Sequence, residues 1–326
     1  MQKNRNLTFP DLLDINIDEY EEMIRRLPDF AKFAPDISQI KENDDLVAAK
    51  KAASSLFSKQ IERIKNALSD PKTGIIALDI AESEKLSTND NAYWGVVVAL
   101  ALGSNIFELA KDRANNTPYT VYAASYKKSK ELASFGLETV APETKLGFHT
   151  DGVINNTHVL MPHNIMLYNI IIEYQKPGYF YWVPFSLWSE RKLYMDRIGV
   201  GKRYRIRVTP SIYEVAGEMT LFSPQEVEAP IFVSDAPLGN PLYINGNVVG
   251  AKDDPEFDLT LIDDLKSSLS ENVIRFAVPQ KTRRVIFADN LKGAHARDVF
   301  EGPLTGVPFT RLFMRSVDAK MIDLSR

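Results

Sequence analysis

The stretch "KLGFHTDG" (residues 145–152) places a histidine two positions before an aspartate, in a chain that contains only four histidines. In an extended segment the side chains of residues i and i+2 point to the same side. His149 and Asp151 are therefore expected to project together, while Thr150 faces the other way. An imidazole and a carboxylate presented side by side supply two ligands of a metal site, and a third ligand must come from another part of the chain.

The composition limits what kind of protein this is. Its 326 residues are 44% hydrophobic and 25% charged, which is typical of a globular chain with a sizeable core. The net charge of -4 gives no reason to expect a nucleic acid or an anionic membrane as a partner. The absence of cysteine excludes disulfides, thiolate nucleophiles and cysteine-ligated zinc.

Two further features bear on the location of the chain. Its first residues lack the apolar core of a signal peptide, and its longest apolar run, residues 94–103, is about half the length that spans a bilayer. We therefore expect a cytoplasmic protein without a membrane partner. The sequence does not indicate the oligomeric state. The short basic clusters at residues 126–130 and 281–284 are expected on the solvated surface.

The pattern of apolar residues predicts helices first and strands later. Residues 17–33 and 44–70 carry apolar side chains at spacings of three and four, so the first 72 residues are predicted to be helical. Residues 73–80 read as a short buried strand, and residues 91–111 read as a mostly buried helix.

From about residue 119 the chain becomes rich in β-branched and aromatic residues, in short runs separated by Gly, Pro and Asn. Eight such runs are predicted strands: 119–126, 164–174, 179–185, 203–208, 241–246, 271–279, 283–290 and 310–317. This density favours an antiparallel barrel or jelly roll. We expect one α+β domain over residues 1–326, with a double-stranded β-helix (jelly-roll) core in 73–326, buttressing N-terminal helices in 1–72 and an insertion or lid at 199–270.

The remaining histidines are the candidates for the third ligand. His158 and His163 are five positions apart with a proline between them, a spacing that suits neither one helical face nor one strand face. His295 follows an apolar run and lies in a polar turn. A His-x-Asp pair followed at a long interval by a single histidine is typical of the two-His, one-carboxylate facial triad, which holds Fe(II) and leaves three positions open. Strands distant in sequence become neighbours in a jelly roll, so the long interval is physically reasonable.

Two arginines follow in the predicted strand "PFTRLFMRSV" (308–317). Arg311 and Arg315 are four positions apart and share a face with Phe313. An inward-facing arginine is costly without a partner, and a dicarboxylate ligand would supply one through a bidentate pair. The alternative is two exposed arginines on an edge strand.

Three motifs in this order resemble the Fe(II)/2-oxoglutarate-dependent dioxygenases: "GFHTDG" (147–152), "VIFADNLKGAHAR" (285–297) and "FTRLFMRS" (309–316). The similarity is greatest to the clavaminate synthase-like and taurine dioxygenase-like group, in its free amino acid hydroxylase branch. "GIIALDI" (74–80), "VVVALALGS" (96–104) and the segment 213–246 are also similar to parts of that group, so the resemblance extends from about residue 73 to residue 317.

The resemblance implies a role for five residues. His149, Asp151 and His295 would be the iron ligands, Arg311 would bind the distal carboxylate of 2-oxoglutarate, and Arg315 would contact the prime substrate. The family consumes 2-oxoglutarate and O2, releases succinate and CO2, and usually hydroxylates an unactivated C–H bond. The presence of Asp151 favours hydroxylation, because the halogenases of this superfamily lack the carboxylate. The implied cofactors are Fe(II), the co-substrate 2-oxoglutarate and O2.

The chain departs from the family pattern at one place. Many members have a Gly-Gly-x-Thr/Ser segment whose hydroxyl helps to hold 2-oxoglutarate. The corresponding stretch here is "KPGYFYWVPF" (176–185), which keeps Gly178 and has Phe180 where the hydroxyl would be. Another group must make that contact, or the alignment is shifted by a residue.

The resemblance implies a free L-amino acid as the substrate, with lysine or arginine preferred. Acidic residues that could bind its ammonium groups are Glu214, Glu218, Asp235, Asp253 and Asp254. A dioxygenase that acts on a different small carboxylate is one alternative. Another is a zinc-dependent metallohydrolase with His149, Asp151 and either His158 or His163 as ligands, and a third is a binding module without catalytic activity.

Overall fold

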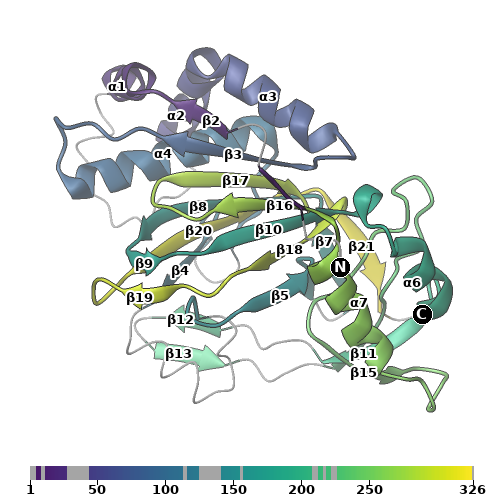
Figure 1. Ribbon diagram of the computed structural model, residues 1–326. Helices are drawn as coiled ribbons and strands as arrows, with labels where there is room; N and C mark the ends of the chain where they lie inside the picture. Colours follow the sequence, from purple (N-terminus) through teal and green to yellow (C-terminus); the bar gives the residue numbers. More distant parts are fainter. Residues whose placement is uncertain are drawn as a thin grey trace.

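A computed structural model of the chain describes residues 5–8, 12–27, 44–112, 116–124, 141–154, 157–207, 212–215, 218–221 and 226–324. Two large sheets dominate it (Figure 1). The six-stranded sheet has the order β2 (Leu12–Ile15), β3 (Ile75–Ile80), β17 (Arg284–Asp289), β8 (Asn164–Ile172), β20 (Phe309–Arg315), β4 (Thr120–Ala124). The five-stranded sheet has the order β1 (Arg5–Thr8), β16 (Ile274–Pro279), β10 (Tyr179–Pro184), β18 (Gly293–Arg297), β5 (Leu146–His149).

The alternation of side chains along the strands separates two hydrophobic layers. In β3, Ile75 and Ala77 pack between the two sheets, whereas Ile76, Leu78 and Ile80 pack on the outer face of the six-stranded sheet. This period of two makes both faces of the sheet apolar, as a central sheet covered on both sides requires. The two sheets therefore face each other across one core, and helices cover the far side of the larger sheet.

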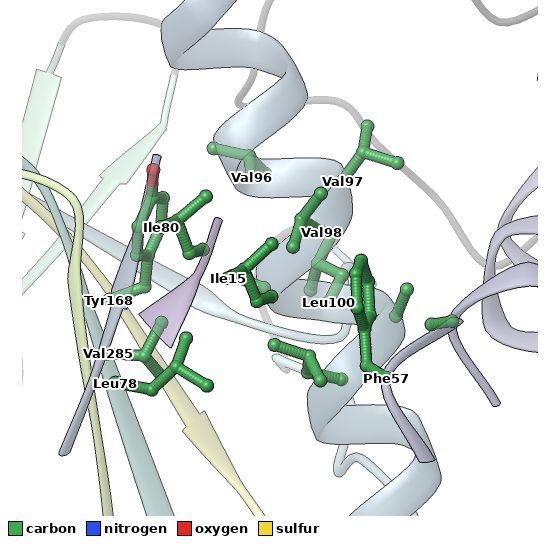
Figure 2. Packing of buried hydrophobic residues seen from close by; sticks show 14 of the residues in the cluster. Ile15, Phe57, Leu78, Ile80, Val96, Val97, Val98, Leu100, Tyr168 and Val285 are labelled. Atoms are coloured by element: carbon green, nitrogen blue, oxygen red, sulfur yellow. The ribbon is translucent and has the colours of Figure 1, made fainter. Parts of the chain in front are cut away.

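Four helices form the outer layer: α1 (Ile17–Arg26), α2 (Asp44–Leu56), α3 (Ser58–Ser69) and α4 (Thr88–Ile106). They lie along the six-stranded sheet on the side away from the five-stranded one (Figure 1). Helix α4 is buried along most of its length and packs against both β8 and α2, while α3 packs directly against β3 and β17. In Figure 2, Ile15 and Ile80 approach α4 from the sheet side, and Phe57 packs beside Leu100 of α4.

Phe57 joins α2 to α3 and has no exposed surface, so its ring is a sensitive test of this layer. Phe57→Ala is expected to lower the free energy of unfolding by about 3–5 kcal/mol, because it removes buried apolar area and leaves a cavity. Urea denaturation of the metal-free protein would measure the loss. Val47→Ala, at a side chain that is 59% exposed on α2, is the control and should change stability by less than about 0.5 kcal/mol. Equal effects at the two positions would contradict the packing described.

Residues 191–207 and 226–271 form a separate layer at one end of the sheets (Figure 1). It contains α6 (Arg191–Ile198), α7 (Thr260–Glu271) and a three-stranded sheet ordered β14 (Glu226–Pro230), β11 (Arg203–Arg207), β15 (Asn247–Ala251). Tyr204, Phe232 and Leu265 lie in its hydrophobic core. Smaller elements complete the described chain: β6 (Val153–Ile154), β7 (His158–Pro162), β21 (Ala319–Asp323), β9 (Tyr174–Lys176), β19 (Glu301–Pro303), β12 (Ile212–Val215), β13 (Glu218–Leu221) and the 3-10 helix Phe185–Leu187.

The structure confirms a mixed α+β architecture, and it differs from the sequence prediction in detail. Among the described strands, the two large sheets do not join into a closed barrel. The segment 1–72 contains strands β1 and β2 as well as helices, and four-residue strands are too short for their alternation to be read. Residues 241–246, predicted as a strand, are extended with a single bridge from Phe232 to Leu242.

The prediction of a solvated basic cluster at 281–284 was wrong for its two arginines. Arg284 is 5% exposed and forms a bidentate pair with Asp79, at 2.7 and 2.8 Å. Arg283 is 7% exposed and donates to the backbone carbonyl oxygens of Ile80, Ala81 and Asn91. Burial is tolerated because each guanidinium finds acceptors. The cluster at 126–130 lies outside the described residues.

No described helix combines the length and the apolar character needed to cross a bilayer.

Candidate metal centre

The structure brings His149, Asp151 and His295 together. His149 ends β5, His295 lies in β18, and the two residues are paired directly across these antiparallel strands. One potential ligand atom from each of the three side chains lies within 4.8 Å of the others. Within the described part of the chain, no other histidine or acidic residues form such a group.

The three side chains border a cavity of about 240 Å³ between the two large sheets. The remaining lining residues are Tyr122, Leu146, Leu167, Phe180, Asn245, Arg297, Phe309, Arg311 and Phe313. One wall comes from β5, β10 and β18, and the opposite wall comes from β4, β8 and β20.

The turn that carries His149 and Asp151 is fixed through the residue between them. Thr150 is fully buried, and its hydroxyl donates to Leu242 O at 3.0 Å and accepts from Ile244 N at 3.1 Å. Because the Thr150 side chain points toward Leu242 and Ile244, the side chains of His149 and Asp151 point to the opposite side. The next residue, Gly152, has no room for a side chain, because a Cβ there would lie 2.7 Å from the Tyr243 ring.

The backbone of Asp151 is held by Asn290, a fully buried residue. Asp151 N donates to Asn290 Oδ1 at 2.8 Å, and Asn290 Nδ2 donates to Asp151 O at 2.9 Å and to Pro162 O at 3.1 Å. Asn290 thus ties the strand that precedes His295 to the turn that carries Asp151.

Asn290→Ala is expected to weaken Fe(II) binding by about 10–100-fold, because outer partners that orient ligands have effects of this size. It should also lower the free energy of unfolding by about 1–3 kcal/mol, since Asp151 N and O lose buried partners. Calorimetric titration with Fe(II) under anaerobic conditions and urea denaturation would measure the two effects. Asn66→Ala, on the exposed face of α3, is the matched control. Unchanged Fe(II) affinity in the Asn290 variant would contradict this positioning role.

The ligand atoms are in states that suit a divalent cation. His149 Nδ1 lies 2.9 Å from Gly147 O, and in the neutral form of the ring, donation to this carbonyl leaves the lone pair on Nε2. Burial, together with the charges of His149 and Arg311, holds the pKa of His295 well below its usual range, so this imidazole is neutral. Burial raises the pKa of Asp151, although the neighbouring charges of His149 and Arg315 oppose the shift.

His295 Nε2 and Asp151 Oδ2 are 3.4 Å apart, yet Oδ2 is buried without a hydrogen-bond partner among the described residues. A buried carboxylate oxygen without a partner is costly. A metal ion bound by the three residues would supply the missing partner, and two imidazoles with one carboxylate form the donor set that Fe(II) accepts. The site therefore fits an Fe(II) ion.

Phe180 packs against His295 of the triad. Its ring is stacked on His295, with ring centroids 5.4 Å apart and an angle of 17° between the planes. It therefore lines the cavity where a hydroxyl was expected from the family pattern. No serine or threonine is among the described lining residues, and the polar groups available besides the triad and Arg311 belong to Tyr122, Asn245 and Arg297.

Arg311 enters the cavity from β20 and is 7% exposed. Its Nε donates to Asn169 Oδ1 at 2.7 Å, and its Nη2 donates to Gln280 Oε1 at 2.9 Å. Burial, with a smaller effect of Arg297, lowers the pKa of Arg311 to about 9, so the side chain is a cation at neutral pH. Asp151 is the only acidic residue among the described residues that line this cavity.

Arg315 does not line the cavity that contains Arg311. It borders a neighbouring cavity of about 130 Å³, together with Asp112, Val153 and Leu160. It is still close enough to Asp151 for its charge to lower the pKa of that carboxyl. The two arginines therefore line two different cavities, and only that of Arg311 contains the triad.

The other sequence candidates lie away from the triad. His163 pairs with Asp318 at 2.8 Å, and His158 Nδ1 lies 2.9 Å from the Thr157 hydroxyl. Asp235 pairs with Lys320 and Asp254 pairs with Lys202, while Asp253 is exposed. The side chains of Glu214 and Glu218 lie outside the described part of the chain.

Sequence reasoning missed the polar residues that support the site, namely Asn169, Asn245, Gln280, Asn290 and Arg297. A signal existed for one of them. Asn169 is a polar residue inside the apolar run "NIMLYNIII", where a buried amide needs a specific partner. The others lie in turns or strands where polar residues are ordinary.

Comparisons with known proteins agree with this geometry. No protein-family model and no curated protein matches the chain. Among solved structures, asparagine oxygenase in complex with Fe(II), 2S,3S-3-hydroxyasparagine and succinate matches with a TM-score of 0.64 at 14% identity, covering 94% of this chain and 93% of the other. The non-heme iron oxygenase OrfP in complex with Fe and alpha-ketoglutaric acid matches with a TM-score of 0.62 at 13% identity, covering 95% and 94%. OrfP in complex with Fe, succinate and (3S)-hydroxy-L-Arg matches with a TM-score of 0.62 at 11% identity, covering 94% of each chain. The chain therefore has the fold of these non-heme iron oxygenases, as the order of its motifs predicted.

Proposed function

We propose that the chain is an Fe(II)- and 2-oxoglutarate-dependent dioxygenase that hydroxylates an unactivated C–H bond of a free L-amino acid. The observation that carries the proposal is one cavity that holds both a two-His, one-carboxylate group and a buried arginine. The two facing sheets and the likeness to iron oxygenases support a jelly-roll reading of the core.

In this proposal His149, Asp151 and His295 hold the iron, and bound Fe(II) supplies the oxidative chemistry with O2 and 2-oxoglutarate. Arg311 binds the distal carboxylate of 2-oxoglutarate, because a guanidinium matches a carboxylate with two parallel hydrogen bonds. Its Nε and Nη2 already donate to amides, which fixes the plane of the guanidinium before the ligand arrives.

The apolar walls keep water away from the reacting centre. Leu167, Phe180, Phe309 and Phe313 line the same cavity as the triad and Arg311. A low-dielectric space strengthens the pairing of Arg311 with a carboxylate and limits side reactions with water.

Arg315 is the proposed partner for the carboxylate of the amino acid. Its position beside Asp151, but in the neighbouring cavity, would separate the prime substrate from the co-substrate. The solved relatives hold hydroxyasparagine and hydroxyarginine, which supports a free amino acid as the substrate class. Arginine or lysine is the first choice, and a different small carboxylate is the alternative.

The zinc metallohydrolase is not favoured. That reading requires His158 or His163 beside Asp151, and His163 instead pairs with Asp318. His295 occupies the third position of the group.

The test is succinate formation by protein reconstituted anaerobically with Fe(II), then supplied with 2-oxoglutarate, O2 and each free L-amino acid in turn. Mass spectrometry of the same mixtures would detect the gain of one oxygen atom. We expect one amino acid to stimulate succinate formation with matching oxygen insertion. Succinate formation that no amino acid stimulates would overturn the substrate class and keep the chemistry. No succinate under any condition, with zinc bound that iron does not replace, would overturn the dioxygenase.

A further inference from the structure

The side chain of Arg311 is buried, and its hydrogen-bond partners carry no charge. Both acceptors, Asn169 Oδ1 and Gln280 Oε1, belong to neutral amides. Elsewhere in the chain, the buried Arg284 is paired with the carboxylate of Asp79. The protein therefore satisfies the geometry of the Arg311 guanidinium without neutralising its charge.

The two amides come from different parts of the fold and support each other. Asn169 lies in β8 opposite Arg311, at an irregularity in the pairing of β8 with β20. Gln280 follows β16, in the turn that leads from the five-stranded sheet to the six-stranded sheet. Asn169 Nδ2 donates to Gln280 Oε1 at 3.0 Å and to Lys281 O at 3.2 Å. Both amide side chains are buried, at 0% and 2% exposure.

The two polar atoms of the Gln280 side chain differ in their hydrogen bonding. Gln280 Oε1 accepts two hydrogen bonds, whereas its Nε2 is buried without a partner among the described residues. A buried donor without an acceptor is destabilising. A glutamate would accept the same two bonds and would pair with a buried cation, while its second oxygen would replace Nε2 as the atom without a partner.

We propose that Asn169 and Gln280 form a neutral brace, which fixes the Arg311 guanidinium while it leaves the whole positive charge available to the distal carboxylate of 2-oxoglutarate. Gln280 is then a positioning residue whose lack of charge matters as much as its shape. The inference rests on the proposed function, because it takes Arg311 as the anchor of the co-substrate. It goes further in assigning a role to two residues that do not touch the iron.

The electrostatic reason is that a carboxylate at position 280 would compete with the ligand carboxylate for the charge of Arg311. In a buried site, two opposite charges a few ångströms apart interact far more strongly than in water. A carboxylate fixed on the far side of Arg311 would offset the cation in the unliganded protein, and so the gain from binding a second carboxylate would fall. The unliganded protein carries the destabilisation of a buried charge, and ligand binding relieves it.

The experiment is the single substitution Gln280→Glu in the full chain, loaded anaerobically with Fe(II). Calorimetric titration with 2-oxoglutarate should give a Kd raised by about tenfold or more. The Kd of Fe(II) should stay within about twofold of the wild-type value, because residue 280 contacts none of the three ligands. The melting temperature of the metal-free variant should rise by about 2 °C or more, since the variant pairs a buried cation with a carboxylate.

Gln175→Glu is the matched control, because it makes the same change of charge at an exposed position in β9. It should leave both Kd values unchanged. Gln280→Met, which has no acceptor and no charge, is the second variant in case the glutamate variant does not fold. It should raise the Kd of 2-oxoglutarate by about fivefold, the value of one hydrogen bond.

The outcomes separate this inference from the proposed function. Wild-type affinity for 2-oxoglutarate in Gln280→Glu, or in Gln280→Met if only that variant folds, would overturn the brace and leave the dioxygenase standing. A wild-type protein that binds Fe(II) but no 2-oxoglutarate would overturn the proposed function, and the brace with it. A rise in melting temperature together with weaker 2-oxoglutarate binding is the signature of the brace, since a merely structural residue would not change the two in opposite directions.

Discussion

Asp151→Asn is expected to lower Fe(II) affinity and succinate formation by more than about a hundredfold, while the metal-free protein becomes more stable. Residues that only orient metal ligands have effects of about 10–100-fold, so loss of a ligand should exceed that range. The gain in stability follows because the variant removes a buried carboxylate whose Oδ2 has no hydrogen-bond partner among the described residues. We expect about 1 kcal/mol or more, measured by urea denaturation without metal.

The pH dependence of that gain has a definite sign. Burial raises the pKa of Asp151 in the folded state above its value in the unfolded chain. The native state is therefore disfavoured as the pH rises through the folded pKa, and no penalty exists below the unfolded pKa. The stability difference between Asp151→Asn and the wild type should grow with rising pH and vanish in acid. Asp79→Asn is the control with the opposite pattern: it breaks the pair with Arg284, loses about 3 kcal/mol, and keeps wild-type Fe(II) affinity. Retention of iron by Asp151→Asn would refute the assigned ligand.

Arg311→Met is expected to raise the Kd of 2-oxoglutarate by about a hundredfold or more, with little change in Fe(II) affinity. Methionine keeps much of the volume of the side chain and removes the cation, and the loss of one partner of a buried charge pair has an effect of this size. Calorimetric titration of the Fe(II)-loaded variant with 2-oxoglutarate would measure it. In a turnover assay the apparent KM for 2-oxoglutarate should rise in parallel.

Arg284→Met is the matched control for Arg311→Met. Arg284 is also a buried arginine in the six-stranded sheet, but its partner is Asp79 and it does not line the cavity. The control should lose about 3–5 kcal/mol of stability, because it leaves Asp79 without its buried partner. It should keep the wild-type Kd for 2-oxoglutarate. Equal affinities in the two variants would show that Arg311 is not the anchor.

The grouping of His149, Asp151 and His295 was predictable because the pattern of these residues is local and chemical. His149 and Asp151 are separated by one residue, and the period of two in an extended segment is enough to place them on one side. His295 needed the additional knowledge that distant strands meet in this type of fold. The structure shows this meeting of distant strands, because His149 of β5 is paired with His295 of β18.

The supporting residues were not predictable because their partners are far away in the sequence. Asn290 is 139 positions from Asp151, and Asn169 is 142 positions from Arg311. No local pattern distinguishes such an amide from one on the surface. The same limit explains Arg284, whose burial depends on a carboxylate in β3, and the strands β1 and β2, whose four residues pair with strands in other parts of the chain.

The anchoring of Thr150 has a consequence for when the protein becomes able to load iron. The turn that carries His149 and Asp151 is held by the backbone of Leu242 and Ile244, over 90 positions further along the chain, and by Asn290 beyond them. Contacts of such long sequence separation carry a high entropic cost of loop closure and form late in folding. A nascent chain on the ribosome would carry two of the ligands long before it could orient them. Under the proposed function, iron binding would therefore be a late event in maturation, and iron incorporation would report completed folding.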